Sequence, residues 1–153
     1  MNNSLYFFAN NGSGVKLMRF MEENPAPQMV FNGSASGLWS DGSNWDRQAV
    51  PTENDTVFIN AGTPFSPVIN GTAYVAVLNL AAGATINLPS ATDSLVVGRI
   101  INANSNILSG NGELVLMNNS NETLTINGNL RVPELYIRTN TILQNGAITI
   151  TGE

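Results

Sequence analysis

The chain has 153 residues, of which 42% are hydrophobic and only 11% are charged, and its formal net charge is −5. A single domain of this length can bury a sizeable core. The basic residues are few and scattered along the chain: Lys16, Arg19, Arg47, Arg99, Arg131 and Arg138. Nucleic acids and anionic membranes require clustered cations, so we expect neither as a partner.

The chain contains no Cys and no His. Their absence removes disulfides, thiolate metal ligands and the commonest general base, and we expect no cofactor and no metal. Asn is abundant throughout the chain instead. Asn suits tight turns and also stacks in ladders along repeating β structure. We therefore expect a neutral, polar surface. The short apolar segments separated by Gly and Asn turns predict an all-β protein.

Residues 1–30 predict an N-terminal arm or docking segment. Leu5 to Phe8 indicate a short strand, whereas residues 15–24 fit both a helical stripe and strand alternation, and Pro25 and Pro27 end either element. The arm either covers an open end of the core or attaches to a partner chain. Its candidate docking residues are Leu5, Tyr6, Phe7, Phe8, Leu17, Met18, Phe20 and Met21.

Residues 31–60 predict a cap that leads into the first clean strand. The two tryptophans of the chain lie six positions apart, with Asp, Gly and Asn between them to turn the backbone. A Val-Pro pair then imposes an extended geometry before the strand at residues 56–59. The cap residues that we single out are Trp39, Asn44, Trp45, Pro51 and Asp55.

The pattern W…NW…VP…ND.V.I, together with the strand repeats that follow it, resembles large bacterial surface and secreted adhesin-like proteins and phage fibre and decoration proteins. The matching positions are Trp39, Asn44, Trp45, Pro51, Asp55, Val57 and Ile59. In the resembling proteins, this element leads into the coils of a parallel β-solenoid. The resemblance therefore implies a solenoid here, and it implies a structural or adhesive role.

Residues 61–153 read as repeating short apolar strands separated by Gly and Asn turns. Leu95-x-Val97 recurs as Leu124-x-Ile126, and Ile86-x-Leu88 recurs at nearly the same spacing as Leu114-x-Leu116. Three such dyads per unit of roughly 24–29 residues are typical of a single-stranded, right-handed parallel β-helix. We expect about three to four coils. The alternative is a β-sandwich, which also contains many short alternating strands.

The alternation along these strands predicts which side chains face inward. They are Val75, Val77, Leu80, Ile86, Leu88, Leu95, Val97, Ile107, Leu114, Leu116, Leu124, Ile126, Leu130, Leu135, Ile137, Ile142, Ile148 and Ile150. The last of these strands is followed only by Thr151, Gly152 and Glu153, and nothing there reads as a cap. An uncapped coil presents open strand edges, so we expect another chain, a continuation of the protein or a neighbouring copy to cover it.

The acidic residues do not indicate a catalytic site. Asp93 and Glu122 occupy similar points before two strands and are the best pair for glycoside hydrolysis, but solvated turn residues explain them more simply. Asp41, Asn44, Asp46 and Asp55 carry oxygen ligands that suit calcium, yet their spacing matches no known loop. We expect no catalytic residue, and we expect these side chains to cap turns.

The pattern as a whole predicts a non-enzymatic structural or display protein on the exterior of a larger assembly. A virion fibre, a head-decoration protein or a tail-associated protein fits best, with a location on the virion surface or outside the cell, and no secretory signal is visible. We expect a homo-oligomer, with a trimer favoured, that attaches through the arm or the open coil and contacts host glycans. The alternatives are a fragment of a secreted adhesin or surface protein and a fragment of a carbohydrate-active β-helix enzyme.

Overall fold

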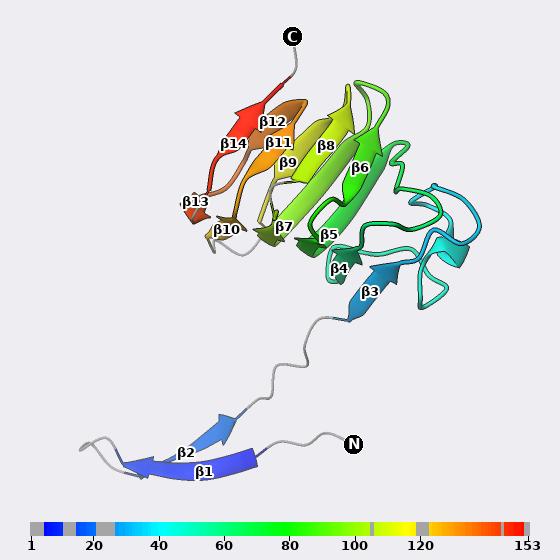
Figure 1. Cartoon of the computed structure of the whole chain (residues 1–153). Helices are drawn as coiled ribbons and strands as arrows, with labels where there is room; N and C mark the ends of the chain where they lie inside the picture. The colour runs from blue at the N-terminus through cyan, green and yellow to red at the C-terminus, as the bar shows by residue number, and fades with distance from the viewer. Residues whose placement is uncertain are drawn as a thin grey trace.

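A computed structural model describes residues 5–10, 15–20, 27–104, 106–118, 123–144 and 146–151. Its regular secondary structure is almost entirely β-strand (Figure 1). The strands are β1 (Leu5–Asn10), β2 (Val15–Phe20), β3 (Gln28–Phe31), β4 (Thr56–Ile59), β5 (Thr72–Leu80), β6 (Thr85–Leu88), β7 (Ser94–Asn102), β8 (Asn106–Gly110), β9 (Glu113–Leu116), β10 (Leu124–Asn127), β11 (Leu130–Val132), β12 (Glu134–Ile137), β13 (Thr141–Gln144) and β14 (Ile148–Ile150). One 3-10 turn, η1 (Gly42–Asn44), lies within the cap.

β1 and β2 form an antiparallel hairpin, in which Leu5 pairs with Phe20 and Asn10 with Val15. The expected strand at residues 5–8 is therefore present, and the ambiguity at residues 15–24 is resolved as a strand over residues 15–20. Figure 1 shows the hairpin apart from the remaining strands. Met21, one of the expected docking residues, lies outside the described residues.

The other strands wind into a parallel β-solenoid of about four turns, so the expected solenoid is confirmed over the sandwich. Three faces enclose the core. β3, β4, β10, β13 and the later halves of β5 and β7 form the first face, and β6, β8, β11 and β14 form the second. β9, β12 and the earlier halves of β5 and β7 form the third. Since β5 and β7 each bend across a corner, the first and third faces join as one eight-stranded sheet.

The coils are slightly shorter than the sequence repeats suggest, and their register differs from the expected one. Residues bonded across successive coils are 22, 23 and 25 positions apart at Thr72–Ser94, Asn79–Asn102 and Asn102–Asn127. Leu95 pairs with Leu114 rather than stacking on Leu124, because the two lie on different faces. Similar dyads recur three times per coil, so two dyads that look alike in the sequence can lie on different faces of the solenoid.

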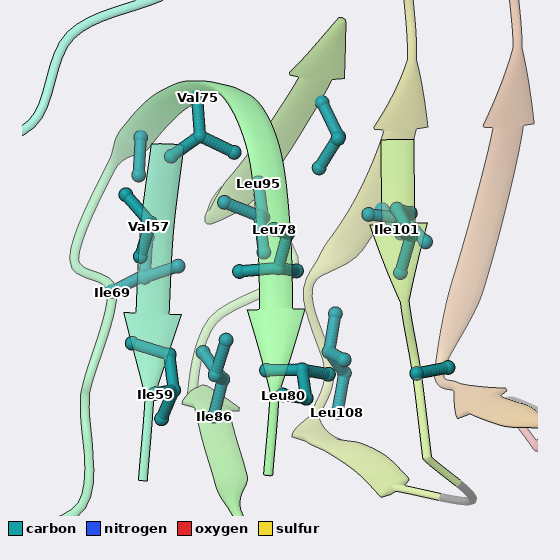
Figure 2. Close-up of a cluster of buried hydrophobic side chains, with 14 of the residues drawn as sticks. Val57, Ile59, Ile69, Val75, Leu78, Leu80, Ile86, Leu95, Ile101 and Leu108 are labelled. Atoms are coloured by element: carbon teal, nitrogen blue, oxygen red, sulfur yellow. The ribbon is translucent and has the colours of Figure 1, made fainter. Parts of the chain in front are cut away.

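Alternating side chains from all three faces fill the interior. Figure 2 shows Ile59, Leu80 and Ile86 among the side chains of this core. Stacking of equivalent strands about 4.8 Å apart places like residues in columns. The expected inward residues that are buried are Val75, Leu80, Ile86, Leu88, Leu95, Val97, Leu114, Leu116, Leu124, Ile126 and Leu130.

Two expected core residues face outward instead. The register of β5 shifts between Val75 and Val77, so that Leu78 takes the inward position and Val77 is only half-buried. On β13, Ile142 pairs with the half-buried Thr125 and is 48% exposed. Ile107 is also an expected core residue, but its side chain lies outside the described part of the structure.

The last coil leaves part of the core columns uncovered. Ile137 continues the column of Leu116 and Ile150 continues that of Val132, yet they are 56% and 59% exposed. Leu135 and Ile148 are partly buried against the core. These residues face inward as expected, but their exposure shows that no described residue covers this end of the solenoid.

Among the described residues, no helix has the length and apolar character needed to cross a membrane.

Candidate functional site

The cap packs three aromatic rings over the first coil. Trp39 and Trp45 meet edge to face with centroids 4.7 Å apart, and Phe31 meets Trp45 in the same way at 5.1 Å. All three side chains are buried. Trp45 Nε1 donates to Trp39 O at 2.9 Å, whereas Trp39 Nε1 has no partner among the described residues. The edge-to-face geometry places the positive ring edge against the negative face of its neighbour, so this part of the cap is a structural element.

Asn44 is the polar centre of the cap and is fully buried. Its Oδ1 accepts from Ala35 N at 3.0 Å and from Ser36 N at 2.8 Å. Its Nδ2 donates to Ser36 Oγ at 2.8 Å and to Leu38 O at 2.9 Å. One side chain therefore satisfies every hydrogen-bonding position of its own amide and fixes the path of residues 35–38.

Two aspartates fix the flanks of the same loop. Asp41 Oδ1 accepts from Ser43 Oγ at 2.6 Å and from Ser43 N at 3.0 Å, and these hydrogen bonds lower the pKa of Asp41 below its ordinary value of 3.8. Asp46 Oδ1 accepts from Val30 N at 2.9 Å. Asp41 therefore caps its own turn, as expected. Asp46 instead bonds the backbone of β3, sixteen positions earlier in the chain.

Asp55 and Asp93 cap two copies of one turn. Asp55 Oδ2 accepts from Thr52 N at 2.7 Å, and Asp93 Oδ2 accepts from Ser90 N at 2.7 Å. Both aspartates are buried, and each turn follows a proline, Pro51 or Pro89. The shared pattern Pro-(Ser/Thr)-x-x-Asp-(Ser/Thr) stands at residues 51–56 and 89–94. A search for this pattern in the sequence would have found that the two turns are equivalent.

The carboxylates considered for catalysis or calcium do not converge in the described structure. Asp93 Oδ1 accepts from Gly71 N at 2.7 Å, so both of its oxygens serve backbone groups. Glu122, its proposed partner, lies outside the described residues. In the described part of the chain, no three His, Cys, Asp or Glu side chains gather where they could hold a metal ion.

An Asn ladder runs along the outside of the first face. Asn102 Nδ2 donates to Asn79 Oδ1, and Asn127 Nδ2 donates to Asn102 Oδ1 at 2.7 Å. The three residues occupy the same position in successive coils. The expectation that Asn stacks in ladders is therefore confirmed, and the ladder ties neighbouring coils together through side chains.

The uncovered last coil is a candidate docking surface. β12 pairs with β9 on one side, and no described strand pairs with its other side. In addition to Ile137 and Ile150, Tyr136 is exposed at this end of the solenoid, by 42%. The Tyr136 hydroxyl donates to Glu134 Oε1 at 3.0 Å. That hydrogen bond raises the pKa of Tyr136. The arrangement offers both open backbone groups and apolar side chains to another chain.

A family model described as a domain of unknown function (DUF8693) matches residues 30–142, which is more than half of the chain. The match covers the cap and all but the final part of the solenoid. No curated protein and no solved structure matches the chain.

Proposed function

The chain belongs to the DUF8693 family, a family of unknown function, and we propose that it is a non-enzymatic structural protein on the exterior of a larger assembly. Among such structural proteins, we propose a virion fibre, a head-decoration protein or a tail-associated protein. Support comes from the described carboxylates of the cap and turns, which bond the chain's own backbone. Further support comes from the uncovered apolar coil at the end of a solenoid.

The observation that carries the proposal is the self-complementary edge of β12. This strand and the residue after it read Glu134-Leu135-Tyr136-Ile137-Arg138. If two copies pair antiparallel about Tyr136, Glu134 of one copy lies opposite Arg138 of the other, and Leu135 lies opposite Ile137. Directly opposite residues of opposite charge stabilise a strand pair, and apolar pairs do the same. Within the described part of one copy, neither Glu134 nor Arg138 forms an ion pair.

The same twofold axis covers the remaining edges of the open coil. The coil runs in the order β12, β13, β14 around three sides. A twofold axis through the middle of β12 therefore brings β13 of one copy towards β14 of the second, and it sets the exposed Ile150 near the facing coil. Two solenoids then join end to end in an isologous interface. This geometry favours a dimer in place of the trimer favoured by the sequence-based expectation.

The test reverses the charges at the ends of β12. We expect Arg138→Glu to weaken self-association, because it sets the new carboxylate of one copy against Glu134 of the other. The double variant Glu134→Arg/Arg138→Glu restores the opposite pairing and is expected to associate as the wild type does. Arg131→Glu is the matched control, because Arg131 is exposed on β11, which is paired on both sides by β8 and β14.

Sedimentation equilibrium of the four proteins measures the effect, and circular dichroism confirms that each variant is folded. A single variant that associates like the wild type would overturn the β12 interface. Failure of the double variant to recover association would do the same. Loss of association in the Arg131→Glu control would assign the interface to another surface.

A further inference from the structure

A groove of about 210 Å³ lies on the outer corner between the third and first faces. β5 and β7 supply Tyr74, Gly98 and Arg99 to its lining. Glu53 and Asn54 line it from the turn before β4, and Asn118 from the segment after β9. The groove therefore draws residues from consecutive coils that the solenoid stacks side by side.

Two backbone features hollow out this corner. β5 changes register between Val75 and Val77, where it turns from one face to the next. On the neighbouring coil, Gly98 has no side chain to fill the space. A Cβ added at Gly98 would lie 3.6 Å from Met117 O and 3.7 Å from Val75 O, which are ordinary contacts. The fold therefore tolerates a side chain at this position, and the glycine is not required by backbone strain.

The groove combines an aromatic ring with polar side chains at its margins. Tyr74 is 43% exposed, although its cross-strand neighbour Val96 is only 8% exposed. Glu53 and Arg99 are exposed, and neither forms an ion pair or a side-chain hydrogen bond with another described residue. An exposed aromatic side chain beside unengaged donors and acceptors is suited to a ligand that is apolar on its faces and polar around its edge.

We propose that this groove binds one pyranose ring of a neutral saccharide. A sugar ring presents aliphatic C–H groups on its face, which pack on Tyr74, and hydroxyls around its edge, which bond Glu53, Asn54 and Arg99. The volume is below the roughly 300–1,000 Å³ of pockets that enclose larger ligands, so the groove holds a single ring and leaves the rest of a glycan outside. The net charge of −5 and the carboxylate of Glu53 disfavour an acidic sugar.

The saccharide groove gives the proposed exterior protein a class of ligand, and this inference therefore rests on the proposed function. The two are separable in experiment, however, because the groove draws no lining residue from β12. Saccharide binding without self-association would contradict only the interface. Self-association without saccharide binding would contradict only the groove.

The test titrates the full chain with methyl glucoside, methyl galactoside, methyl mannoside and N-acetylglucosamine, and follows amide signals by heteronuclear NMR. We expect saturable shifts for Gly98, Arg99 and Asn54 with at least one of these sugars. Loss of ring packing in Tyr74→Ala is expected to weaken binding about tenfold. Gly98→Ala narrows the groove without strain, and we expect it to weaken binding while unfolding occurs at the wild-type temperature.

Phe65→Ala is the matched control, because Phe65 is 50% exposed but does not line the groove. Its binding is expected to equal that of the wild type. Glucuronic acid serves as the acidic probe and is expected to bind more weakly than methyl glucoside. The proposal is overturned if none of the four neutral sugars shifts the groove signals, if Tyr74→Ala binds as the wild type does, or if glucuronic acid binds more tightly.

Discussion

The side chain of Asn44 supplies a large share of the polar bonding of the cap. Replacing it with alanine leaves the amides of Ala35 and Ser36 and the carbonyl of Leu38, whose hydrogen bonds to Asn44 are partly buried, without their side-chain partner. Each unsatisfied buried group costs about 1–3 kcal/mol. We therefore expect Asn44→Ala to lower the free energy of unfolding by about 3 kcal/mol, measured by urea denaturation.

The control for this prediction is Asn60→Ala, at an exposed position where the side chain forms no hydrogen bond with any other described residue. Exposed substitutions of this kind change stability by about 0.5 kcal/mol or less. Equal stability losses in the two variants would contradict the role assigned to Asn44.

Asp41 gives the stability of the cap a dependence on pH. Its folded-state pKa lies below the ordinary value of 3.8 because Ser43 donates two hydrogen bonds to the carboxylate. A group whose pKa is lowered by folding stabilises the protein above the unfolded pKa, and this contribution is lost as pH falls through the folded pKa. We therefore expect Asp41→Asn to unfold more readily than the wild type at neutral pH.

As pH falls below about 4, the wild-type advantage over Asp41→Asn should shrink and then vanish. Thermal unfolding of both proteins in a series of buffers from neutral to acidic pH measures this difference. A difference in melting temperature that is constant across the series would show that Asp41 ionisation does not contribute.

At single positions, the sequence identifies the cap residues but not their bonding. Trp39, Trp45 and Asn44 stand out by type and spacing, and all three are buried in the cap. The backbone partners of Asn44 lie at residues 35–38, in a loop that no periodic pattern places. A loop path set by one side chain is visible only once the chain is folded.

At the level of the strands, the turns between faces determine whether a coil can close. Gly110 has φ +103°, and a Cβ there would overlap Leu88 O and Leu88 C. Gly62 also has a positive φ, +76°, but has nothing within 4 Å of a Cβ. A side chain at Gly62 would carry only the cost of a positive φ, whereas a side chain at Gly110 would also clash with the adjacent coil.

We expect Gly110→Ala to destabilise the protein by several times as much as Gly62→Ala. The second variant carries only the cost of a positive φ, about 1 kcal/mol. The first adds a backbone clash between adjacent coils, which must move apart. Urea unfolding of both variants measures the difference, and similar midpoints would contradict the tight coil contact at Gly110.

Alternation in the sequence predicts the strands of the solenoid better than it predicts their stacking. Leu95-x-Val97, Leu114-x-Leu116 and Leu124-x-Ile126 have the same pattern, but only the first two pair. The pattern does not indicate on which face of the solenoid a dyad lies, because all three faces use similar dyads. The turns between dyads also differ in length, so the face cannot be counted from the spacing. The shift at Val77 arises from a bend in one continuous strand, which alternation reads as regular.

At the scale of the whole molecule, the described solenoid has one end covered by the cap and another end that no described residue covers. The cap covers the first coil with the buried Trp39 and Trp45, whereas the last coil exposes Ile137 and Ile150. The sequence predicts this asymmetry, because the cap motif precedes the repeats. It does not predict the groove beside Tyr74, which depends on a register shift and on a glycine that the fold brings beside it.

In the assembly that we propose, the uncovered last coil joins two copies of the chain. The most direct measurement is the solution mass of the purified protein by light scattering over a range of concentrations. We expect a rise from the 16.3 kDa of one chain to twice that mass, followed by a plateau. A mass of 16.3 kDa at every concentration would contradict the claim, and so would a plateau at three chains.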